Sequence, residues 1–545
     1  MNKIKLLLLI FGLLNISVSI AQTAEPTGTI EIRAKAENLT GMANSGSEGI
    51  VSGLRIAALP ILRPGEIMEM VPGLIVTQHA GDGKANQYFL RGFNLDHGTD
   101  FATYVNGVPA NMPTHAHGQG YTDLNFLIPE LVDLIAYKKG TYSAMDGDFS
   151  AAGSARLEYR KSLDGHLAEV TAGANGYKRL LLAGSPKRQD GQWLYGLEVF
   201  KNDGPWLVPE NYQKLNGVLS YSDGTRLNGY SVTGMLYKSS WISTDQVPLR
   251  AINQGLIGRF GSLDPTTGGE THRYSVSSQW AQTGKDRQTK ANFWALDSAL
   301  DLWSNFEYCT GSIEKTGNCA AGDQFKQAEK RKAFGFGLSE ARYHQLSLLN
   351  SKYESAFTFG VDGRSDHIFP VGLYKTTRRA VTGTVREDAV TQSSVSLWAQ
   401  NEIRWTSTIR SIVGARADAY QFDVKSNLAA NSGKASDQKV SPKLSLIFGP
   451  LGTTEFYANY GAGFHSNDAR GTTISVDPLD RTTPVSRVDP LVKAIGSELG
   501  MRTEIVKGWN SNLALWKLNM ASELLFIGDA GTTEPSAPSK RYGVE

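Results

Sequence analysis

The sequence has little of what would mark a helical membrane protein, a nucleic-acid-binding protein or an enzyme. After the first 21 residues no run of 18 consecutive apolar residues occurs, so the sequence predicts no transmembrane helix. The formal net charge is only +2, and no basic run with interleaved aromatic residues is present, which argues against nucleic-acid binding. Nucleophile-elbow, P-loop and HExxH motifs are also absent. No constellation of residues therefore indicates an enzyme.

The first 21 residues have the pattern of a segment that is removed after export. Lys3 and Lys5 precede an apolar run over residues 6–14, and small residues end the segment at Ala21. This pattern predicts a signal peptide over residues 1–21. A membrane anchor is the alternative, but the apolar run is short for a spanning helix.

Cysteine is scarce. Only Cys309 and Cys319 occur, and both lie in the polar, glycine-rich segment EYCTGSIEKTGNCAAGD, which predicts a loop. In an exported chain an even number of cysteines favours a disulfide between them. Such a bond is worth roughly 3 kcal/mol in the chain-entropy model and would stiffen a long external loop. A pair of metal thiolates is the alternative, but no other metal ligand lies nearby in the sequence.

From about residue 161 the sequence alternates apolar and polar residues in segments of roughly ten, with turn residues between them. In one such segment Val395 and Leu397 share a face, while Ser396 and Gln400 lie on the other. The pattern is typical of outer-membrane β-strands, but a soluble antiparallel sandwich alternates in the same way. At roughly 20 to 25 residues per strand and loop, residues 161–545 supply about 15 to 17 strands.

Residues 63–159 differ, because short apolar clusters are separated there by glycine-rich turns, which predicts a small mixed domain with its own core. Four motifs follow one another: VPGL at 71–74, LRGF at 90–93, YVNGV at 104–108 and a longer segment from IPELVDLIAYKKG to GSARLEY at 128–159. In sequence and order they resemble the plug domain of TonB-dependent outer-membrane receptors. Four motifs in the right order are far more specific than one.

The resemblance implies a mostly β protein, in which a transmembrane antiparallel β-barrel of about 22 strands in the family encloses an N-terminal α+β plug. After the signal peptide, its implied parts are a TonB-box segment with a flexible tether (22–53), the plug (54–160) and the barrel (161–545). The sequence has room for fewer strands than the family barrel, and it ends as it enters another apparent strand. We therefore expect the C-terminal strands of the barrel to be missing.

The segment TIEIRA, near the mature N-terminus, resembles the TonB box of this family. It consists of Thr29, Ile30, Glu31, Ile32, Arg33 and Ala34. Glu31 and Arg33 are more polar than the residues of many family members. An extended segment can be captured by strand addition, and the resemblance implies a TonB-type inner-membrane energy-coupling protein as the partner. The alternative is that the segment is simply the first strand of the plug.

The predicted plug holds four of the nine histidines: His79, His97, His115 and His117. In an extended segment His115 and His117 would lie on one face, where they could bind a transition metal or a metal chelate. His465 and Asp468 follow a predicted strand and could face the same cavity. Because the plug apex touches the ligand in the family, all six residues are candidate ligand contacts. The alternative is that they are polar loop residues bonded to the plug backbone or the barrel wall.

The resemblance also implies structural roles for Arg91 and Gly92 of the LRGF motif and for the acidic residues Glu130 and Asp133. In the family, such residues form ion pairs within the plug or with the barrel wall. The implied role is to hold the plug in one register, since breaking a buried ion pair is costly.

The function that the resemblance implies is TonB-dependent import of a scarce solute across the outer membrane of a Gram-negative bacterium. An iron–siderophore or another metal complex is the first candidate solute. Import of cobalamin or carbohydrate and a passive or structural barrel are the alternatives. We expect no required cofactor, a bound metal or chelate only as cargo, and outer-membrane lipid as a further partner.

Overall fold

The computed structural model describes residues 39–78, 81–186, 191–243, 246–305, 323–348, 351–506, 508–527, 532–535 and 537–545. Several sequence predictions fall outside these residues. They are the signal peptide (1–21), the TonB-box residues (29–34), His79, and the disulfide between Cys309 and Cys319.

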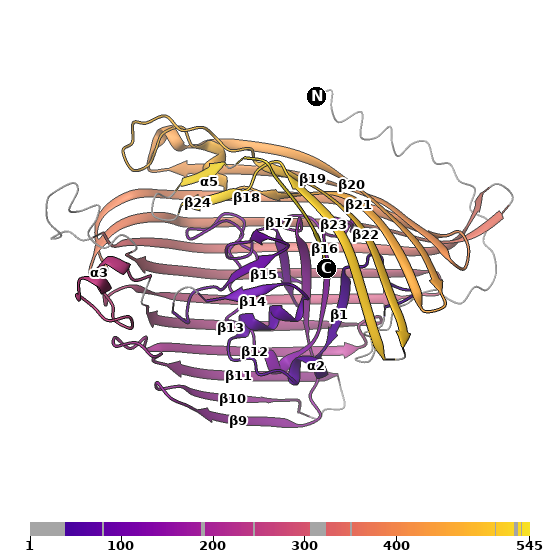
Figure 1. Ribbon diagram of the computed structural model, residues 1–545, viewed down its shortest axis with the longest axis horizontal. Coiled ribbons are helices and arrows are strands. Elements are labelled where there is room, and N and C mark those ends of the chain that lie inside the picture. Colours follow the sequence, from indigo (N-terminus) through magenta and orange to yellow (C-terminus); the bar gives the residue numbers. More distant parts are fainter. Residues whose placement is uncertain are drawn as a thin grey trace.

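One antiparallel sheet of 16 strands, called the large sheet below, makes up most of the molecule (Figure 1). Its strands pair in chain order, except that β26 follows β23 directly. The strands are β9 (His166–Ala172), β10 (Lys178–Gly184), β11 (Gln192–Asn202), β12 (Tyr212–Gly224), β13 (Gly229–Ile242), β14 (Gly268–Thr283), β15 (Arg287–Ser304), β16 (Phe325–Leu348), β17 (Ser351–Thr377), β18 (Ala380–Arg404), β19 (Ile409–Ser426), β20 (Gly433–Leu451), β21 (Thr454–Ser466), β22 (Leu491–Val506), β23 (Trp509–Met520) and β26 (Ser539–Val544).

The N-terminal elements, from β1 to β8, form a separate body against the concave face of this sheet and are called the plug below (Figure 1). The plug has a five-stranded sheet in the order β1-β7-β8-β5-β6 and a three-stranded sheet in the order β2-β3-β4. Its elements are β1 (Glu48–Ser52), α2 (Gly53–Ala57), η1 (Pro64–Met70), β2 (Ile75–Thr77), β3 (Gln87–Leu90), β4 (Phe93–Asn94), β5 (Phe101–Val105), β6 (Val108–Pro109), η2 (Pro129–Leu131), β7 (Val132–Lys139) and β8 (Gly153–Tyr159).

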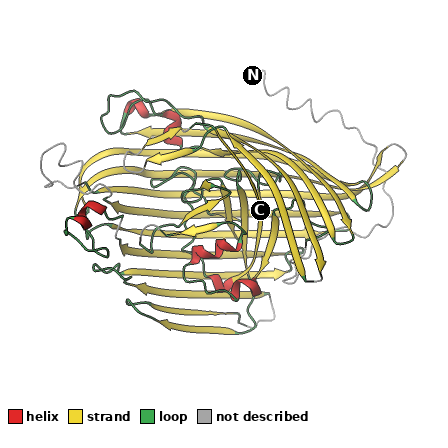
Figure 2. Cartoon of the chain, in the orientation of Figure 1, coloured by secondary structure: helices red, strands yellow, loops and turns green. Residues whose placement is uncertain are grey.

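Few other elements are present, and most of them lie in connections of the large sheet (Figure 2). They are α3 (Leu249–Asn253), η3 (Ala429–Asn431), α5 (Ala469–Thr473), β24 (Leu524–Ile527) and β25 (Thr532–Pro535). No helix among the described residues is long and apolar enough to cross a membrane. The predicted fold, mostly β with an N-terminal plug enclosed by an antiparallel sheet, is confirmed, and the 16 strands fall within the predicted range. Within the described residues β9 pairs only with β10, and β26 only with β23, so the sheet has two edges.

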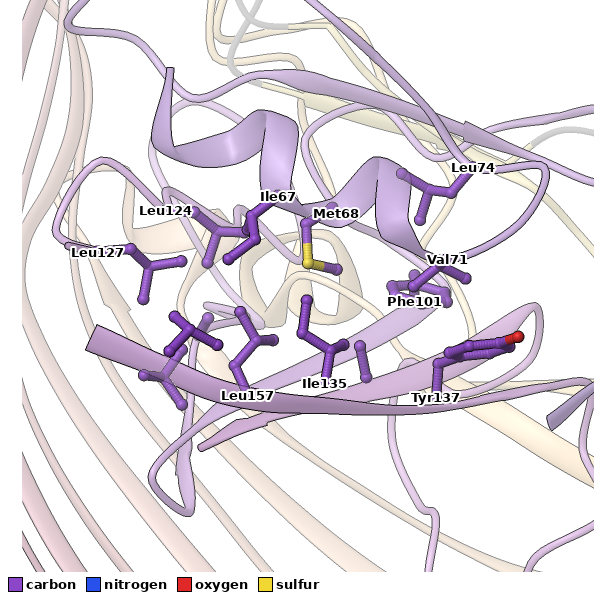
Figure 3. Close-up of a cluster of buried hydrophobic side chains, with 14 of the residues drawn as sticks. Ile67, Met68, Val71, Leu74, Phe101, Leu124, Leu127, Ile135, Tyr137 and Leu157 are labelled. Carbon is purple, nitrogen blue, oxygen red and sulfur yellow. The ribbon is translucent and has the colours of Figure 1, made fainter. Parts of the chain in front are cut away.

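The plug has an apolar core of its own between η1 and the five-stranded sheet (Figure 3). Ile67 and Met68 of η1 are buried against Ile135 of β7 and Leu157 of β8. The turn begins at Pro64, and the Glu66 carboxylate accepts a hydrogen bond from the Arg63 amide at 3.1 Å, which fixes its start. This core explains why the sequence motifs form an independent body.

The C-terminal part of the segment predicted as a flexible tether, from Leu39 to Ser52, is packed against the rest of the protein. Leu39 and Ala43 are buried against the large sheet, and β1 pairs antiparallel with β7 from Glu48 to Ser52. The segment is short and rich in serine and glycine, so its composition resembled that of a flexible linker. Pairing with a neighbouring strand, which lies far away in the sequence, overrides that local tendency.

The large sheet presents apolar side chains outward and polar ones toward the plug. Leu397 is 59% exposed and its neighbour Ser396 is 4% exposed. The same alternation places Leu444 and Leu446 outward and Lys443 inward. An outward face covered by large apolar side chains is what a lipid-facing wall requires, whereas a soluble sandwich would bury that face.

Small residues let the plug approach the large sheet closely. A Cβ atom on Gly461 of β21 would lie 2.2 Å from the Thr141 carbonyl oxygen, and the Thr141 hydroxyl donates to the Gly461 oxygen at 2.7 Å. Gly496 of β22 meets the same threonine, because its Cβ would lie 2.8 Å from Oγ1. The loop after β7 is therefore seated directly on the backbone of the wall.

We expect Gly461→Ala to loosen this seat and to lower the free energy of unfolding of the plug by roughly 1–3 kcal/mol, because the added methyl group overlaps main-chain atoms. Hydrogen exchange around Thr141 measures the effect. Gly383→Ala is the control, since its Cβ would meet no atom closer than 4.0 Å. Equal protection around Thr141 in the two variants would contradict the close packing.

Candidate functional site

Residues 113–121 of the plug, called the apex segment below, lie against β16 and the connection after β21. Its backbone is held by side chains from β16 and from the connection after β21. The Ala116 amide donates to Glu329 at 3.1 Å, and Arg331 donates to the Thr114 carbonyl oxygen. Arg470 donates to the His115 carbonyl oxygen at 2.8 Å. The wall therefore binds the apex through its main chain.

The apex histidines are buried and form a small aromatic group. The ring of His115 stacks on Tyr121 with centroids 4.1 Å apart and an interplanar angle of 6°. His117 turns instead to His97, so that their Nε2 atoms lie 3.1 Å apart, and its Nδ1 lies 2.6 Å from Gln327 Oε1. Each of the three rings thus has partners within the protein.

Burial controls the charge of these histidines. Removal from water is the largest effect at each ring, and it lowers the pKa of His97 and holds the pKa values of His115 and His117 well below the usual 6.5. Arg331 adds to the shift at His115, and Lys84 adds to it at His117. The apex rings are therefore neutral near pH 7.

The predicted metal pair, His115 and His117, lies in a loop and not in the extended segment that the prediction assumed. The His115 ring stacks on Tyr121, whereas the His117 ring meets Tyr121 edge-on and lies beside His97. In the part of the chain that the structure describes, no group of three or more histidine, cysteine, aspartate or glutamate side chains could hold a metal ion. Any metal contact at the apex would need ligands from the cargo or a rearrangement.

The second predicted pair lies beside the apex. His465 Nδ1 is 2.9 Å from Asp100 Oδ1, and Asp468 accepts a hydrogen bond from the His115 amide at 3.4 Å. Asp468 also pairs with Arg470 at 2.8 Å. The structure thus brings His97, His115, His117, His465 and Asp468 to one region between the plug and the wall.

A buried charged network at this place was not predicted from the sequence. Arg331 is fully buried and bonds to Glu329 at 2.8 Å and to Asp366, which also pairs with Arg364 at 2.7 Å. The signal was the run EKRK at 329–332, since charged residues at inward positions of a membrane strand need a partner. Sequence alone does not show that the partner is the plug.

The other predicted plug residues contact the large sheet near its edges. Arg91 lies 3.3 Å from Glu498 of β22, with both side chains almost completely buried. Glu130 pairs with Arg179 of β10 at 2.6 Å, and Asp133 pairs with Arg226 at 2.8 Å. Arg91 and Gly92 have φ angles of +52° and +72°, and Gly92 accepts a hydrogen bond from Arg541 at 3.0 Å. These contacts join the plug to opposite margins of the sheet.

A cavity of about 950 Å³ separates the plug from the wall below the apex. Polar groups dominate the part of the wall formed by β15 to β19. Arg364 lines the cavity and donates to the Asn111 carbonyl oxygen at 3.0 Å. The lining also includes Tyr104, Arg156, Lys290, Asn292, Asp362 and Arg416. The plug thus fills the sheet incompletely, and Asn111, just before the apex segment, borders the cavity.

Removing the guanidinium of Arg91 leaves Glu498 buried without this ion pair, so we expect Arg91→Met to lower the free energy of unfolding by about 3–5 kcal/mol. Chemical denaturation in detergent measures it. Arg342→Met is the matched control, because that arginine pairs with Glu340 at 2.6 Å in an exposed position. An exposed pair contributes roughly 1 kcal/mol or less. Equal losses in both variants would contradict the role of Arg91.

The apex should open in acid. Since the His115 and His117 pKa values are lowered in the fold, the unfolded segment binds more protons below pH 6.5, and stability falls as pH drops below that value. The measurement is the ratio of hydrogen exchange at pH 5.5 to that at pH 7.5 over residues 113–121. We expect this ratio to be larger for the unaltered protein than for His115→Asn/His117→Asn. The same pH dependence in both proteins would contradict this assignment.

Sequence-family and structural comparisons agree with this architecture. Residues 41–154 match the TonB-dependent Receptor Plug Domain, and residues 207–545 match the family described as TonB dependent receptor-like, beta-barrel. Among solved structures, the unliganded ferric citrate transporter FecA is 13% identical with a TM-score of 0.69, covering 92% of this chain and 74% of that one. The copper transporter OprC is also 13% identical, with a TM-score of 0.68, covering 91% of this chain and 75% of that one.

A third similar structure is the pyoverdine outer-membrane receptor FpvA from Pseudomonas aeruginosa PAO1 bound to pyoverdine. It is 13% identical with a TM-score of 0.68, covering 92% of this chain and 74% of that one. At such identities the likeness shows the fold alone. The barrel match, however, spans more than half of the sequence, and it follows a plug match in the order that the structure displays. The chain therefore belongs to the family of TonB-dependent receptors.

Proposed function

We propose that this protein imports a metal complex across the outer membrane of a Gram-negative bacterium, driven by a TonB-type inner-membrane protein. The observation that carries the proposal is the seat of the apex segment, whose main chain is bonded to β16 and to the connection after β21. A plug held in this way blocks free diffusion. The similarity to ferric citrate, pyoverdine and copper transport proteins supports a metal complex as cargo.

An energy source is needed because the plug is held firmly. To shift the ratio of displaced to seated plug from 1:99 to 99:1 takes about 5.5 kcal/mol of free energy. A TonB-type partner would supply it by pulling on residues 29–34, captured as an added strand. The chain after these residues reaches the fold at Leu39 and enters β1, which pairs with β7. Force applied to the N-terminus would therefore act first on the contacts of Leu39 and Ala43 with the large sheet, and then on β1 of the five-stranded sheet.

The apex region supplies the chemistry for cargo contact. Its neutral imidazoles and the oxygen atoms of Asp468 and Gln327 are donors or acceptors that a metal chelate can use. The protein needs no resident cofactor for this task, since the metal arrives and leaves as cargo. No bond is made or broken in the cargo, so the proposal includes no catalytic step.

Coupling is tested with proline, which cannot donate to an added strand. We expect Ile30→Pro/Ile32→Pro to abolish uptake of labelled ferric chelates in a strain that lacks the chromosomal copy, while chelate binding to the purified protein is unchanged. Glu31→Gln/Arg33→Gln is the control, because it keeps the backbone donors. Unchanged uptake in the proline variant would leave a passive barrel as the better description.

The cargo is tested by growth and by titration. We expect the complemented strain to grow on ferric chelates, zinc or copper as sole sources, and purified protein to bind the corresponding complex. His115→Gln/His117→Gln should weaken that binding by about tenfold, which corresponds to roughly 1.4 kcal/mol from lost hydrogen bonds. Growth on cobalamin or a carbohydrate instead, with no effect of the histidine variant, would overturn the assignment of a metal complex.

A further inference from the structure

The outward face of the large sheet is not uniformly apolar. A hollow of about 480 Å³ lies on it across β14 to β19. Side chains that line it from outward positions include His272, Asp297, Lys330, Lys332, His367, Thr391, Asp423 and Lys425. Many outward positions of the wall elsewhere carry large apolar side chains, such as Val395, Leu397 and Val413, so a hollow lined by charged side chains requires a separate explanation.

A bulge in β17 coincides with this hollow. Arg331 pairs with Ile368 and Glu329 pairs with Val371, so Phe369 and Pro370 of β17 lie opposite the single residue Lys330 of β16. The register between β17 and β18 shifts at the same two residues, between Ile368 and Val371. A bulge leaves a residue out of the ladder and bends the strand, which opens the surface locally. The hollow therefore arises from the path of the backbone and not only from a gap between long side chains.

The positive charges in the hollow exceed the negative ones. Asp297 lies 3.1 Å from His272, and Asp423 lies 3.3 Å from Lys434. Among the described residues, no carboxylate lies within ion-pair distance of Lys330, Lys332 or Lys425. Three ammonium groups around one hollow repel one another, so an anion placed between them would be attracted.

The position of the hollow indicates what kind of anion is available. On β16, Lys330 and Lys332 come directly before Phe334 and Leu338, which are exposed on the same outward face. The lysines thus lie where the apolar band ends, toward the long connections, such as residues 243–267 and 467–490. Barrels have their long loops outside the cell and their short turns inside. The hollow therefore lies at the level of headgroups in the outer leaflet.

The opposite margin of the same strands is different. There, toward the short turns, Arg342 pairs with Glu340 at 2.6 Å and Arg404 lies 3.6 Å from Glu354. These charges are neutralised by neighbours on the protein. The hollow differs from these pairs because it gathers three lysines that have no ion-pair partner among the described residues.

We propose that this hollow binds the phosphate groups of an anionic lipid in the outer leaflet. The inference rests on the proposed outer-membrane location, but not on which solute the protein imports. Lys330, Lys332 and Lys425 surround the phosphate, and the lipid chains lie along Phe334 and Leu338. The lipid holds the outer margins of β16 and β19 together across three strand boundaries.

The test uses the full-length protein in zwitterionic detergent and measures retained lipid by native mass spectrometry. The probes are diphosphorylated lipid A, its dephosphorylated form and inorganic phosphate. We expect lipid A to bind, and Lys330→Gln/Lys332→Gln/Lys425→Gln to weaken binding about 100-fold, at roughly fivefold per lysine. The arginine versions of the three substitutions should keep binding, which separates lost charge from a folding defect.

A control with the same loss of charge is Lys285→Gln/Arg287→Gln/Lys352→Gln at the short-turn margin, which should bind lipid A as the unaltered protein does. The proposal is overturned if the two glutamine triples behave alike or if the dephosphorylated lipid binds equally well. Displacement by inorganic phosphate at equal concentration would show a site for free phosphate instead. Uptake of labelled chelate is measured separately, so intact lipid binding without uptake would refute only the proposed import.

Discussion

The rest of the structure depends on the pairing of charges buried between the plug and the wall. Arg331, Glu329 and Asp366 lie within the sheet with almost no exposure, and isolated charges there would cost several kcal/mol each. The plug completes their bonding by presenting the Thr114 carbonyl oxygen and the Ala116 amide. Since these groups are main-chain atoms, the wall specifies the path of the apex segment. Wall side chains also contact side chains of the apex segment, since Gln392 accepts a hydrogen bond from the Thr114 hydroxyl and Gln327 lies 2.6 Å from His117 Nδ1.

The contact between plug and wall differs from one side to the other. Toward β10 to β13 it is largely apolar, with Leu181 and Leu194 of the wall in the same cluster as Ile128 and Leu131 of the plug. Toward β16 to β19 it is polar, and the cavity of about 950 Å³ between the two bodies is lined by strands from β11 to β19, for example at Ser220, Lys290 and Arg416. Separating apolar surfaces exposes them to water at about 25 cal/mol per Å², whereas polar groups beside a wet cavity can exchange partners for water.

Much of this fold could be predicted from the sequence, because two local signals are strong. Alternation of period two fixed which side of β18 and β20 faces outward, as Leu397 and Leu446 illustrate. The ordered motifs between residues 71 and 159 indicated the plug. The apex chemistry could not be predicted in the same way. The pairing of His115 with His117 assumed an extended segment, but the ring of His117 meets His97, which lies 20 positions earlier. Contacts of this kind depend on the path by which loops bring distant residues together, and no local repeat of apolar and polar residues encodes that path.

Strand β16 shows why the inner and outer surfaces of this protein cannot be considered separately. Glu329 and Arg331 point to the apex, and Lys330 and Lys332 point outward, so four consecutive charged residues serve two different environments. Alternation fixes this division, since a shift of one residue would exchange the two sets. The bulge of β17, at Phe369 and Pro370, lies opposite Lys330 and therefore between the pairing partners of Glu329 and Arg331. The geometry that opens the outer hollow therefore also sets the positions of Glu329 and Arg331, and a change in one requires a change in the other.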